Sequence, residues 1–424
     1  MKLLIKNGTI ITSDRTEVNR DILIEDNKIS CIGEGISDAV DQIIDAKGLA
    51  VLPGLVDAHC HLRDPGYEYK EDIKSGSMSA AKGGFTSIAC MPNTNPVIDN
   101  ESIVRTIMEK ASHEAVVNVY PIGAITKGLE GNELAEMGSM KAAGIVAVSD
   151  DGKPVMQASV MKKALIYAGG FGLTVISHCE DLNLAEGGSM NEGETSTRLG
   201  IHGIPSAAED VMVSREIILS EYTGMPVHIA HVSTKGAVEM IRQAKKRGVL
   251  VTAETCPHYF TLTEKACEGY NTNAKMNPPL RTQEDVDAVI QGLKDGTIDI
   301  IATDHAPHHF DEKNVEFEMA LNGIVGFETA LPLALTYLVR PGILDLNQLV
   351  DKMSTKPSRI LKIDKGDIRA GADADLVLVN LDEEYTIDTN EFLSKSKNSP
   401  FGGFKVTGRV KYTLVGGRIV YQDR

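Results

Sequence analysis

The strongest constraint on the fold is a series of apolar runs, each of strand length and each followed by a longer segment compatible with a helix. The stretches 206–222 and 235–248 carry apolar residues at helical spacing and end at or near a glycine, as helices often do. Units of this kind imply parallel strands joined by crossovers, and a closed (β/α)8 TIM barrel needs eight of them. An open doubly wound sheet is the alternative. The eight runs span 49–61, 85–92, 116–124, 144–151, 173–180, 226–233, 249–259 and 298–307.

Both ends of the chain have a different, β-like texture. The N-terminal "LLIKNGTIIT" and "DILIEDNKISCIG" alternate apolar and polar residues, and the pairs Asn7-Gly8 and Asp26-Asn27 are predicted turns. The C-terminal segments "ADLVLVNL" and "VKYTLVGGRIVY" have the same β-like pattern as the N-terminal ones, and Gly416-Gly417 is a predicted hairpin turn. We therefore predict a small β-sandwich domain formed by both termini. The predicted division is a β domain of 1–53 and 365–424 and a barrel of 54–364.

Composition excludes several classes of protein. A formal net charge of −16 and the absence of a long Lys/Arg cluster argue against a partner that is a nucleic acid. The apolar part of "MKLLIKNGTII" is too short for a secretory signal, and no window reaches the 18 or so apolar residues of a membrane span. The six cysteines form no C-x-x-C pair, which favours a reducing compartment. We expect a soluble, cytoplasmic protein that binds no membrane.

Each apolar run turns polar at its C-terminal end. In a parallel barrel these ends open onto one face, so residues far apart in sequence converge on one site. Because side chains alternate along a strand, His59 and His61 point the same way and Cys60 points elsewhere. The polar residues at these ends are His59, His61, Asp150, Asp151, His178, His231 and Asp304.

This set of side chains predicts a metal site. A single histidine at a strand end is more often structural than a ligand, but packing alone does not require the whole set. Imidazole with carboxylate is a ligand mix that suits zinc. The set exceeds what one tetrahedral zinc needs, which indicates two metals that share a bridging group. Asp150, Asp151 and a carboxylated Lys153 are all possible bridges, and spacing alone does not choose among them.

Two longer motifs resemble a known family. "DAHCHLRDP" at 57–65 resembles the metal-binding signature of the amidohydrolase superfamily, and "ATDHAPHHFDEK" at 302–313 resembles the second signature of its dihydroorotase family, bacterial class I type. "MPNT", "SDDG", "SHCED", "AHVST", "ETCPHY" and "MNPPLR" follow in the family's order, so the resemblance spans the barrel nearly end to end. "GDIRAGADADLVL" is similar to the split β domain of such hydrolases.

The resemblance implies a role for each matching residue. His59, His61 and Asp304 would hold one Zn²⁺, His178 and His231 the second, and Asp151 would bridge them, since class I members have aspartate where other relatives use a carboxylated lysine. Asp304 would also be the catalytic acid and base. Relatives commonly have Phe-Gly where this chain has Asn322-Gly323. The implied substrate-binding residues are His61, Arg63, Asn93, Asn277, His308, Asn322 and Gly323.

The implied activity is the reversible, zinc-dependent cyclisation of N-carbamoyl-L-aspartate to L-dihydroorotate in de novo pyrimidine biosynthesis. The planar fork of Arg63 would bind the substrate carboxylate. A hydantoinase, dihydropyrimidinase or allantoinase is the main alternative, although such relatives lack the pairing of Arg63 with Asn93. A non-catalytic assembly protein is a further alternative, but such proteins usually lose zinc ligands, and all six positions are filled here. Similar proteins are commonly homodimers, and association with another pyrimidine-pathway enzyme is possible.

Overall fold

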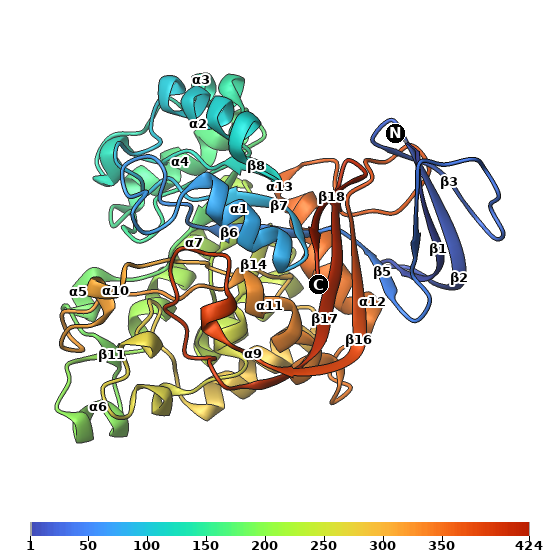
Figure 1. Cartoon of the computed structure of the whole chain (residues 1–424). Helices are drawn as coiled ribbons and strands as arrows, with labels where there is room; N and C mark the ends of the chain where they lie inside the picture. Colours follow the sequence, from blue (N-terminus) through green and yellow to red (C-terminus); the bar gives the residue numbers. More distant parts are fainter. Residues whose placement is uncertain (1, 424) are drawn as a thin grey trace.

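A computed structural model describes residues 2–423 (Figure 1). Eight parallel strands form a closed barrel within it. Hydrogen bonding joins β6, β7 and β8 in one sheet and β9, β10, β13, β14 and β15 in another. Gly123 N donates to Ala147 O (3.1 Å) at one seam, and His61 N donates to His305 O (2.8 Å) at the other. The expected barrel is therefore confirmed. Its strands are β6 (Leu55–Cys60), β7 (Phe85–Cys90), β8 (Asn118–Pro121), β9 (Ala147–Ser149), β10 (Thr174–Ser177), β13 (Val227–Ile229), β14 (Val251–Thr255) and β15 (Ile300–Ile301).

Helices follow the strands and cover the outside of the barrel. The two stretches with helical spacing form α7 and α8. The hydroxyl of Thr234 caps α8 by accepting from Ala237 N, and the apolar face of α8 includes Val238 and Ile241. The main helices are α1 (Ile73–Lys82), α2 (Glu101–Glu114), α3 (Met137–Ala143), α4 (Ala158–Gly170), α7 (Ala207–Thr223), α8 (Lys235–Lys246), α9 (Gln283–Asp295) and α11 (Phe327–Ala334). Shorter elements are α5 (Leu182–Ala185), β11 (Met190–Asn191), α6 (Glu194–Leu199), β12 (Gly203–Ile204), α10 (Phe310–Lys313), α12 (Leu346–Val350) and α13 (Lys356–Leu361).

Strands from both termini form one eight-stranded sheet beside the barrel, which confirms the expected β unit (Figure 1). Turns fall at Asp26-Asn27 and Gly416-Gly417 as predicted. The predicted turn at Asn7-Gly8 is wrong, because β1 continues through this pair with an irregular register. A side chain at Gly8 would meet Val51 at 2.6 Å, so the close strand approach explains the glycine. The strands are β1 (Lys2–Ile11), β2 (Thr16–Glu25), β3 (Lys28–Gly33), β4 (Gln42–Asp45), β5 (Ala50–Pro53), β16 (Leu376–Thr386), β17 (Lys405–Val415) and β18 (Arg418–Gln422).

The central strands of this sheet are apolar on both faces because each face packs against a different core. On β16, Leu376 and Leu378 join the core of the β unit, whereas Val377 and Val379 join the core shared with the barrel. The run 49–61 is two strands rather than one, since β5 belongs to this sheet and β6 to the barrel. The change occurs at Gly54, where a side chain would meet Thr86 at 2.0 Å. These separate cores support our proposed division near residue 53.

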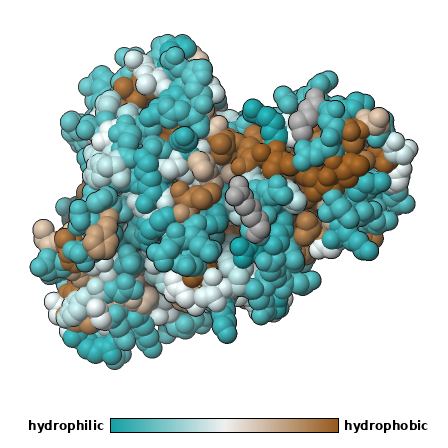
Figure 2. Space-filling model, in the orientation of Figure 1, coloured by the Kyte–Doolittle hydropathy of each residue, from teal (hydrophilic) through white to brown (hydrophobic). Residues whose placement is uncertain are grey.

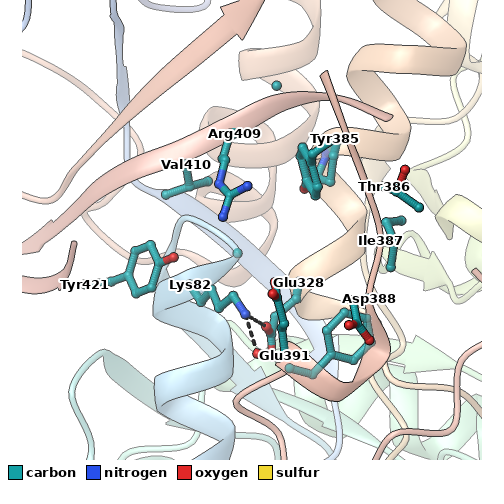
Figure 3. Close-up of a pocket in the computed structure, with 14 residues that line it drawn as sticks. Lys82, Glu328, Tyr385, Thr386, Ile387, Asp388, Glu391, Arg409, Val410 and Tyr421 are labelled. Atoms are coloured by element: carbon teal, nitrogen blue, oxygen red, sulfur yellow. Dashed lines mark hydrogen bonds and ion pairs between the residues drawn. The ribbon is translucent and has the colours of Figure 1, made fainter. Parts of the chain in front are cut away.

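The barrel and the β unit differ in surface character, and they meet at an interface that we call the joint. Figure 2 shows apolar residues gathered over the β unit on this face, while the barrel surface is mostly hydrophilic. A cavity of about 210 Å³ lies between α1, α11 and β16–β18. There Lys82 pairs with Glu328 at 2.9 Å, and Arg409 pairs with Asp423 at 3.0 Å (Figure 3 shows Lys82, Glu328 and Arg409). Both cations that line this cavity are thus paired with carboxylates. No helix in residues 2–423 combines the length and apolar composition that a bilayer-spanning segment requires.

Candidate functional site

The first histidine pair meets two carboxylates at the C-terminal end of the barrel. His59 Nε2 lies 3.4 Å from Asp151 Oδ1 and 3.5 Å from Asp304 Oδ1. His61 Nε2 lies 3.5 Å from Asp151 Oδ2 and 3.1 Å from Asp304 Oδ1. All four side chains are buried. The alternation of side chains on β6 thus brings both imidazoles to the same two carboxylates.

The second histidine pair meets the same Asp151 carboxylate. His178 Nδ1 and His231 Nε2 lie 3.5 and 3.4 Å from Asp151 Oδ1. These two nitrogens are only 2.8 Å apart. Asp151 therefore belongs to two groups of possible metal ligands, one with His59 and His61 and one with His178 and His231.

Asp150 and Lys153 lie outside this cluster. One Asp150 oxygen accepts from Ile125 N (2.8 Å) and Thr126 N (3.0 Å), and the other accepts from the Thr126 hydroxyl, so this carboxylate fixes the loop after β8. Lys153 is exposed. The choice between Asp150 and Asp151, which spacing left open, is thus decided by local contacts. Consecutive residues face opposite ways, and the backbone N–H groups of the loop bind Asp150. Asp151 is the carboxylate among the histidines.

Polar partners fix the ring orientation of the first pair. His59 Nδ1 lies 2.6 Å from Glu254 Oε1, and His61 Nδ1 lies 2.9 Å from Asn93 Oδ1. Both oxygens are acceptors, so each Nδ1 carries a proton, and Nε2 is the ring nitrogen that faces the two carboxylates. Glu254 also contacts His228 Nε2 at 3.1 Å. This is the arrangement in which a second carboxylate or amide orients a metal-binding imidazole.

The electrostatics of the cluster favour a cation. Burial alone lowers the pKa of His59, but the charges of Asp151, Glu254 and Asp304 outweigh it and raise that pKa well above its usual value. Burial also opposes the charge on His178, whose pKa nevertheless rises to about 10 because of Asp151 and Glu180. The same negative potential that stabilises protons here would stabilise metal ions in their place.

The donor set fits divalent metal ions. His59 Nε2 is buried and has no hydrogen-bond partner in residues 2–423, although it points at two carboxylates. Two imidazole nitrogens 2.8 Å apart both face Asp151, a contact that a shared metal ligand set explains. Four imidazoles and two carboxylates suit zinc better than the all-oxygen sites of calcium or magnesium.

A cavity of about 220 Å³ opens beside the cluster. Its volume suits a small ring rather than a polymer. Of the residues that the family resemblance assigned to metal or substrate, all but His59 line this cavity. These lining residues include His61, Arg63, Asn93, Asp151, His178, His231, Asn277, Asp304, His308, Asn322 and Gly323.

Arg63 has no carboxylate partner among the described residues. Its Nε donates to Pro307 O at 3.2 Å, and the neighbouring Asp64 pairs with Lys110 instead, at 2.7 Å. The guanidinium lines the cavity next to His308. Burial lowers the pKa of His308 well below its usual value, and the charge of Arg63 lowers it further, so His308 is neutral. The cavity therefore presents an unpaired cation that a substrate carboxylate can match.

Other polar groups that line the cavity also lack partners among the described residues. Asn277 Nδ2 donates to Glu180 Oε2 at 3.0 Å, while its buried Oδ1 has no hydrogen-bond partner in the described chain. Asn322 is exposed. Its backbone carbonyl accepts from His308 Nε2 at 2.7 Å, and its backbone N–H has no acceptor within residues 2–423. Gly323 N and O are both bonded within the protein. The cavity is thus lined by two residues that each keep one polar group without a partner in the described chain, an acceptor at Asn277 and a backbone donor at Asn322.

Backbone strain accompanies the site. Arg63, His231 and Asp304 have backbone φ values of 60°, 33° and 45°, which lie in the left-handed region that residues other than glycine rarely adopt. Each lies two or three residues after the end of a barrel strand. Strain of this kind costs free energy and concentrates where a precise side-chain position is required.

Sequence reasoning missed several buried polar residues behind the site. Asp57 accepts from Thr303 N (2.9 Å) and Oγ1 (2.6 Å) and so fixes the residue before Asp304. Glu254 orients His59, and a carboxylate inside the apolar run 249–259 was the available signal. Asn398 has no local signal, because it reaches His308 N (3.1 Å) from the C-terminal β unit.

Comparison with known proteins places this geometry in a family. Residues 48–237 match the model of the Dihydro-orotase-like family, and residues 275–421 match that of the Amidohydrolase family. A dihydroorotase from Acetivibrio thermocellus is 63% identical over 100% of this chain and 99% of its own. One from Ruminiclostridium cellulolyticum is 62% identical over 100% of this chain and 99% of its own. The chain belongs to the dihydroorotase family. The predicted family and the prediction of an enzyme that hydrolyses cyclic amides are confirmed.

Solved structures with the same fold include cyclic amide hydrolases. An L-hydantoinase from Arthrobacter aurescens is 28% identical and superimposes with a TM-score of 0.90 over 99% of this chain and 96% of its own. A dihydropyrimidinase from Brevibacillus agri is also 28% identical, with a TM-score of 0.89 over 100% of this chain and 95% of its own. The dihydroorotase family thus shares its barrel and terminal β unit with these hydrolases.

Proposed function

We propose that this protein is a dihydroorotase that interconverts N-carbamoyl-L-aspartate and L-dihydroorotate in pyrimidine biosynthesis. One observation carries the proposal: the unpaired guanidinium of Arg63 lines the same small cavity as two histidine pairs that share Asp151. A cyclic amide that bears a carboxylate is the substrate class that these groups match together. Relatives named dihydroorotase that are 54–63% identical over the whole chain support it.

We propose that the site holds two Zn²⁺ ions. His59, His61 and Asp304 would hold one, His178 and His231 the other, and Asp151 would bridge them, as their contacts suggest. When bound, zinc activates water and polarises a carbonyl group as a Lewis acid.

Asp304 is the proposed acid and base. Burial opposes its negative charge, but His59 and His61 outweigh burial and hold the pKa of Asp304 below its usual value, so it is ionised at neutral pH. In ring opening, Asp304 takes a proton from the water that attacks the amide carbonyl and returns it to the ring nitrogen as the C–N bond breaks. Ring closure uses the same groups in reverse.

Arg63, Asn277 and Asn322 are the proposed groups that orient the substrate. The planar guanidinium of Arg63 binds the substrate carboxylate. Asn277 Oδ1 accepts from a ring N–H, and the backbone N–H of Asn322 donates to a ring carbonyl. Asn93 and His308 complete the wall. Asn93 also fixes the ring of His61, and neutral His308 holds the Asn322 carbonyl.

An assay of competing substrates tests the proposal. The purified protein should turn over dihydroorotate and, at equal concentration, turn over hydantoin and dihydrouracil poorly, because neither has the carboxylate that Arg63 matches. A chelator should abolish the activity, and added Zn²⁺ should restore it. A protein that opened hydantoin faster than dihydroorotate would instead be a hydantoinase, as the shared fold allows.

The cysteines bear on the cellular setting. All six cysteines are free thiols, which favours the proposed cytoplasmic location. The homodimer and association with another pyrimidine-pathway enzyme stay predictions of the family resemblance.

A further inference from the structure

A buried lysine behind the substrate cavity has no counter-ion. Lys313, the last residue of α10, is 5% exposed. Its Nζ donates to Leu321 O at 2.7 Å, Gly323 O at 3.1 Å and Lys275 O at 3.3 Å. No carboxylate in residues 2–423 lies within ion-pair distance of it, so three carbonyl groups match the three N–H bonds of the ammonium.

The three carbonyls belong to the two chain segments that form one wall of the cavity. Leu321 and Gly323 flank Asn322, whose backbone N–H binds the substrate in our proposal. Lys275 precedes Asn277 by two residues, and Gly323 N donates to Lys275 O at 3.0 Å. The ammonium therefore ties the Asn322 loop to the Asn277 segment.

A second donor meets the same loop. Asn398 Nδ2 donates to Gly323 O at 3.0 Å and to Ala306 O at 3.1 Å, while its Oδ1 accepts from His308 N. Gly323 O is thus shared by Lys313 and Asn398. This junction fixes His308, Asn322 and Asn277 relative to one another, although neither donor lines the cavity itself.

Packing alone does not explain an ammonium at this position. A buried charge without an ion pair is costly, and burial together with the charge of Lys275 lowers the pKa of Lys313 to about 7. A methionine would fill a similar volume without that cost, but it would remove the donor to Leu321 O and leave Gly323 O and Lys275 O with one donor fewer each. The hydrogen bonds that Lys313 makes therefore offset the cost of burying its charge.

We infer that Lys313 is a positioning residue for substrate binding, because its three hydrogen bonds hold the Asn322 amide and Asn277 at the spacing that a bound ring requires. The inference rests on the proposed dihydroorotase activity. Lys313 touches neither the substrate nor the metal ligands, so its loss should affect the Michaelis constant more than the chemical step.

The test compares Lys313→Met with a matched control, Lys352→Met. Lys352 is likewise buried, and its Nζ donates to Ile298 O at 2.7 Å, at the end of β15 remote from the site. We expect Lys313→Met to raise KM for dihydroorotate about tenfold, the loss of roughly one hydrogen bond, with kcat changed less and zinc content unchanged. Lys352→Met should lower Tm without changing KM.

Other outcomes have distinct meanings. A folded Lys313→Met protein with wild-type KM overturns the inference, and so does an equal rise of KM in Lys352→Met. If Lys313→Met does not fold, Lys313→Gln, which keeps an N–H donor, decides: a smaller rise of KM supports the role and wild-type KM overturns it. A wild-type protein that does not act on dihydroorotate contradicts the proposed function itself, before Lys313 is considered.

Discussion

Replacement of Glu254 with glutamine should weaken metal binding without changing the ligands. Glu254 is 0% exposed and contacts His59 Nδ1 at 2.6 Å and His228 Nε2 at 3.1 Å. Burial opposes its charge, but His59 and His228 outweigh burial and lower the pKa of Glu254, so the carboxylate is ionised. Glutamine keeps the volume and one acceptor oxygen but removes the negative charge that makes His59 a stronger ligand.

The size of the effect follows from this geometry. Loss of such a partner costs about 10- to 100-fold in metal affinity. Because glutamine can still accept from His59 Nδ1, we expect about tenfold for Glu254→Gln, or about 1.4 kcal/mol. Glu254→Ala removes the acceptor as well and should reach about 100-fold, or about 2.7 kcal/mol.

Zinc affinity can be measured by competition with a chromophoric chelator, with bound metal counted by mass spectrometry. Glu328→Gln is the matched control, since Glu328 is also a buried carboxylate, accepts from Ser79 Oγ at 2.7 Å and lies at the joint with the β unit (Figure 3). The control should bind zinc like the wild type. Wild-type affinity in Glu254→Gln, or equal losses in both variants, would refute the reasoning.

Three further predictions concern substrate binding, the loop at Gly323 and stability. Arg63→Lys should raise KM for dihydroorotate and leave zinc content unchanged, because the bidentate fork is lost while the ligands remain; equal loss of zinc and activity would contradict this. Gly323→Ala should lower kcat/KM, since φ is 126° and the new methyl would meet Ala306 Cβ at 2.6 Å and His308 Nε2 at 3.3 Å; an unchanged kcat/KM would show that the loop yields. Burial lowers the pKa of Lys352 from 10.5 to about 8, so between these pH values the unfolded chain binds more protons and wild-type stability should rise with pH relative to Lys352→Met. Urea unfolding of both proteins at pH 7.5 to 10 measures the difference, and a flat or falling difference would count against it.

Much of the barrel follows from the sequence because its signal is repeated. Each of the eight apolar runs contains a barrel strand, and polar residues at the run ends meet where parallel strands must bring them. Local alternation was less informative at the N-terminus. Asn7-Gly8 has the composition of a turn, yet the pairing of β1 with β2 and β5 carries the strand through it. Long-range pairing overrode the local preference there.

The site was predictable where motifs supplied it and unpredictable where distant segments meet. His59 and His61 share a face because of strand geometry, whereas the choice between Asp150 and Asp151 depended on amides of Ile125 and Thr126 that no spacing reveals. The contact of Asn398 with the loop after β15 joins residues 90 positions apart in the chain. No local pattern marks such a partner.

The central claim is that two metal ions share Asp151 between two histidine pairs. Anomalous diffraction at the zinc edge, from crystals of the zinc-loaded protein, tests it most directly. We predict two anomalous peaks that flank the Asp151 carboxylate, one beside His59 and His61 and one beside His178 and His231. A fully active crystal form with no peak at Asp151, or with zinc bound elsewhere, would contradict the account.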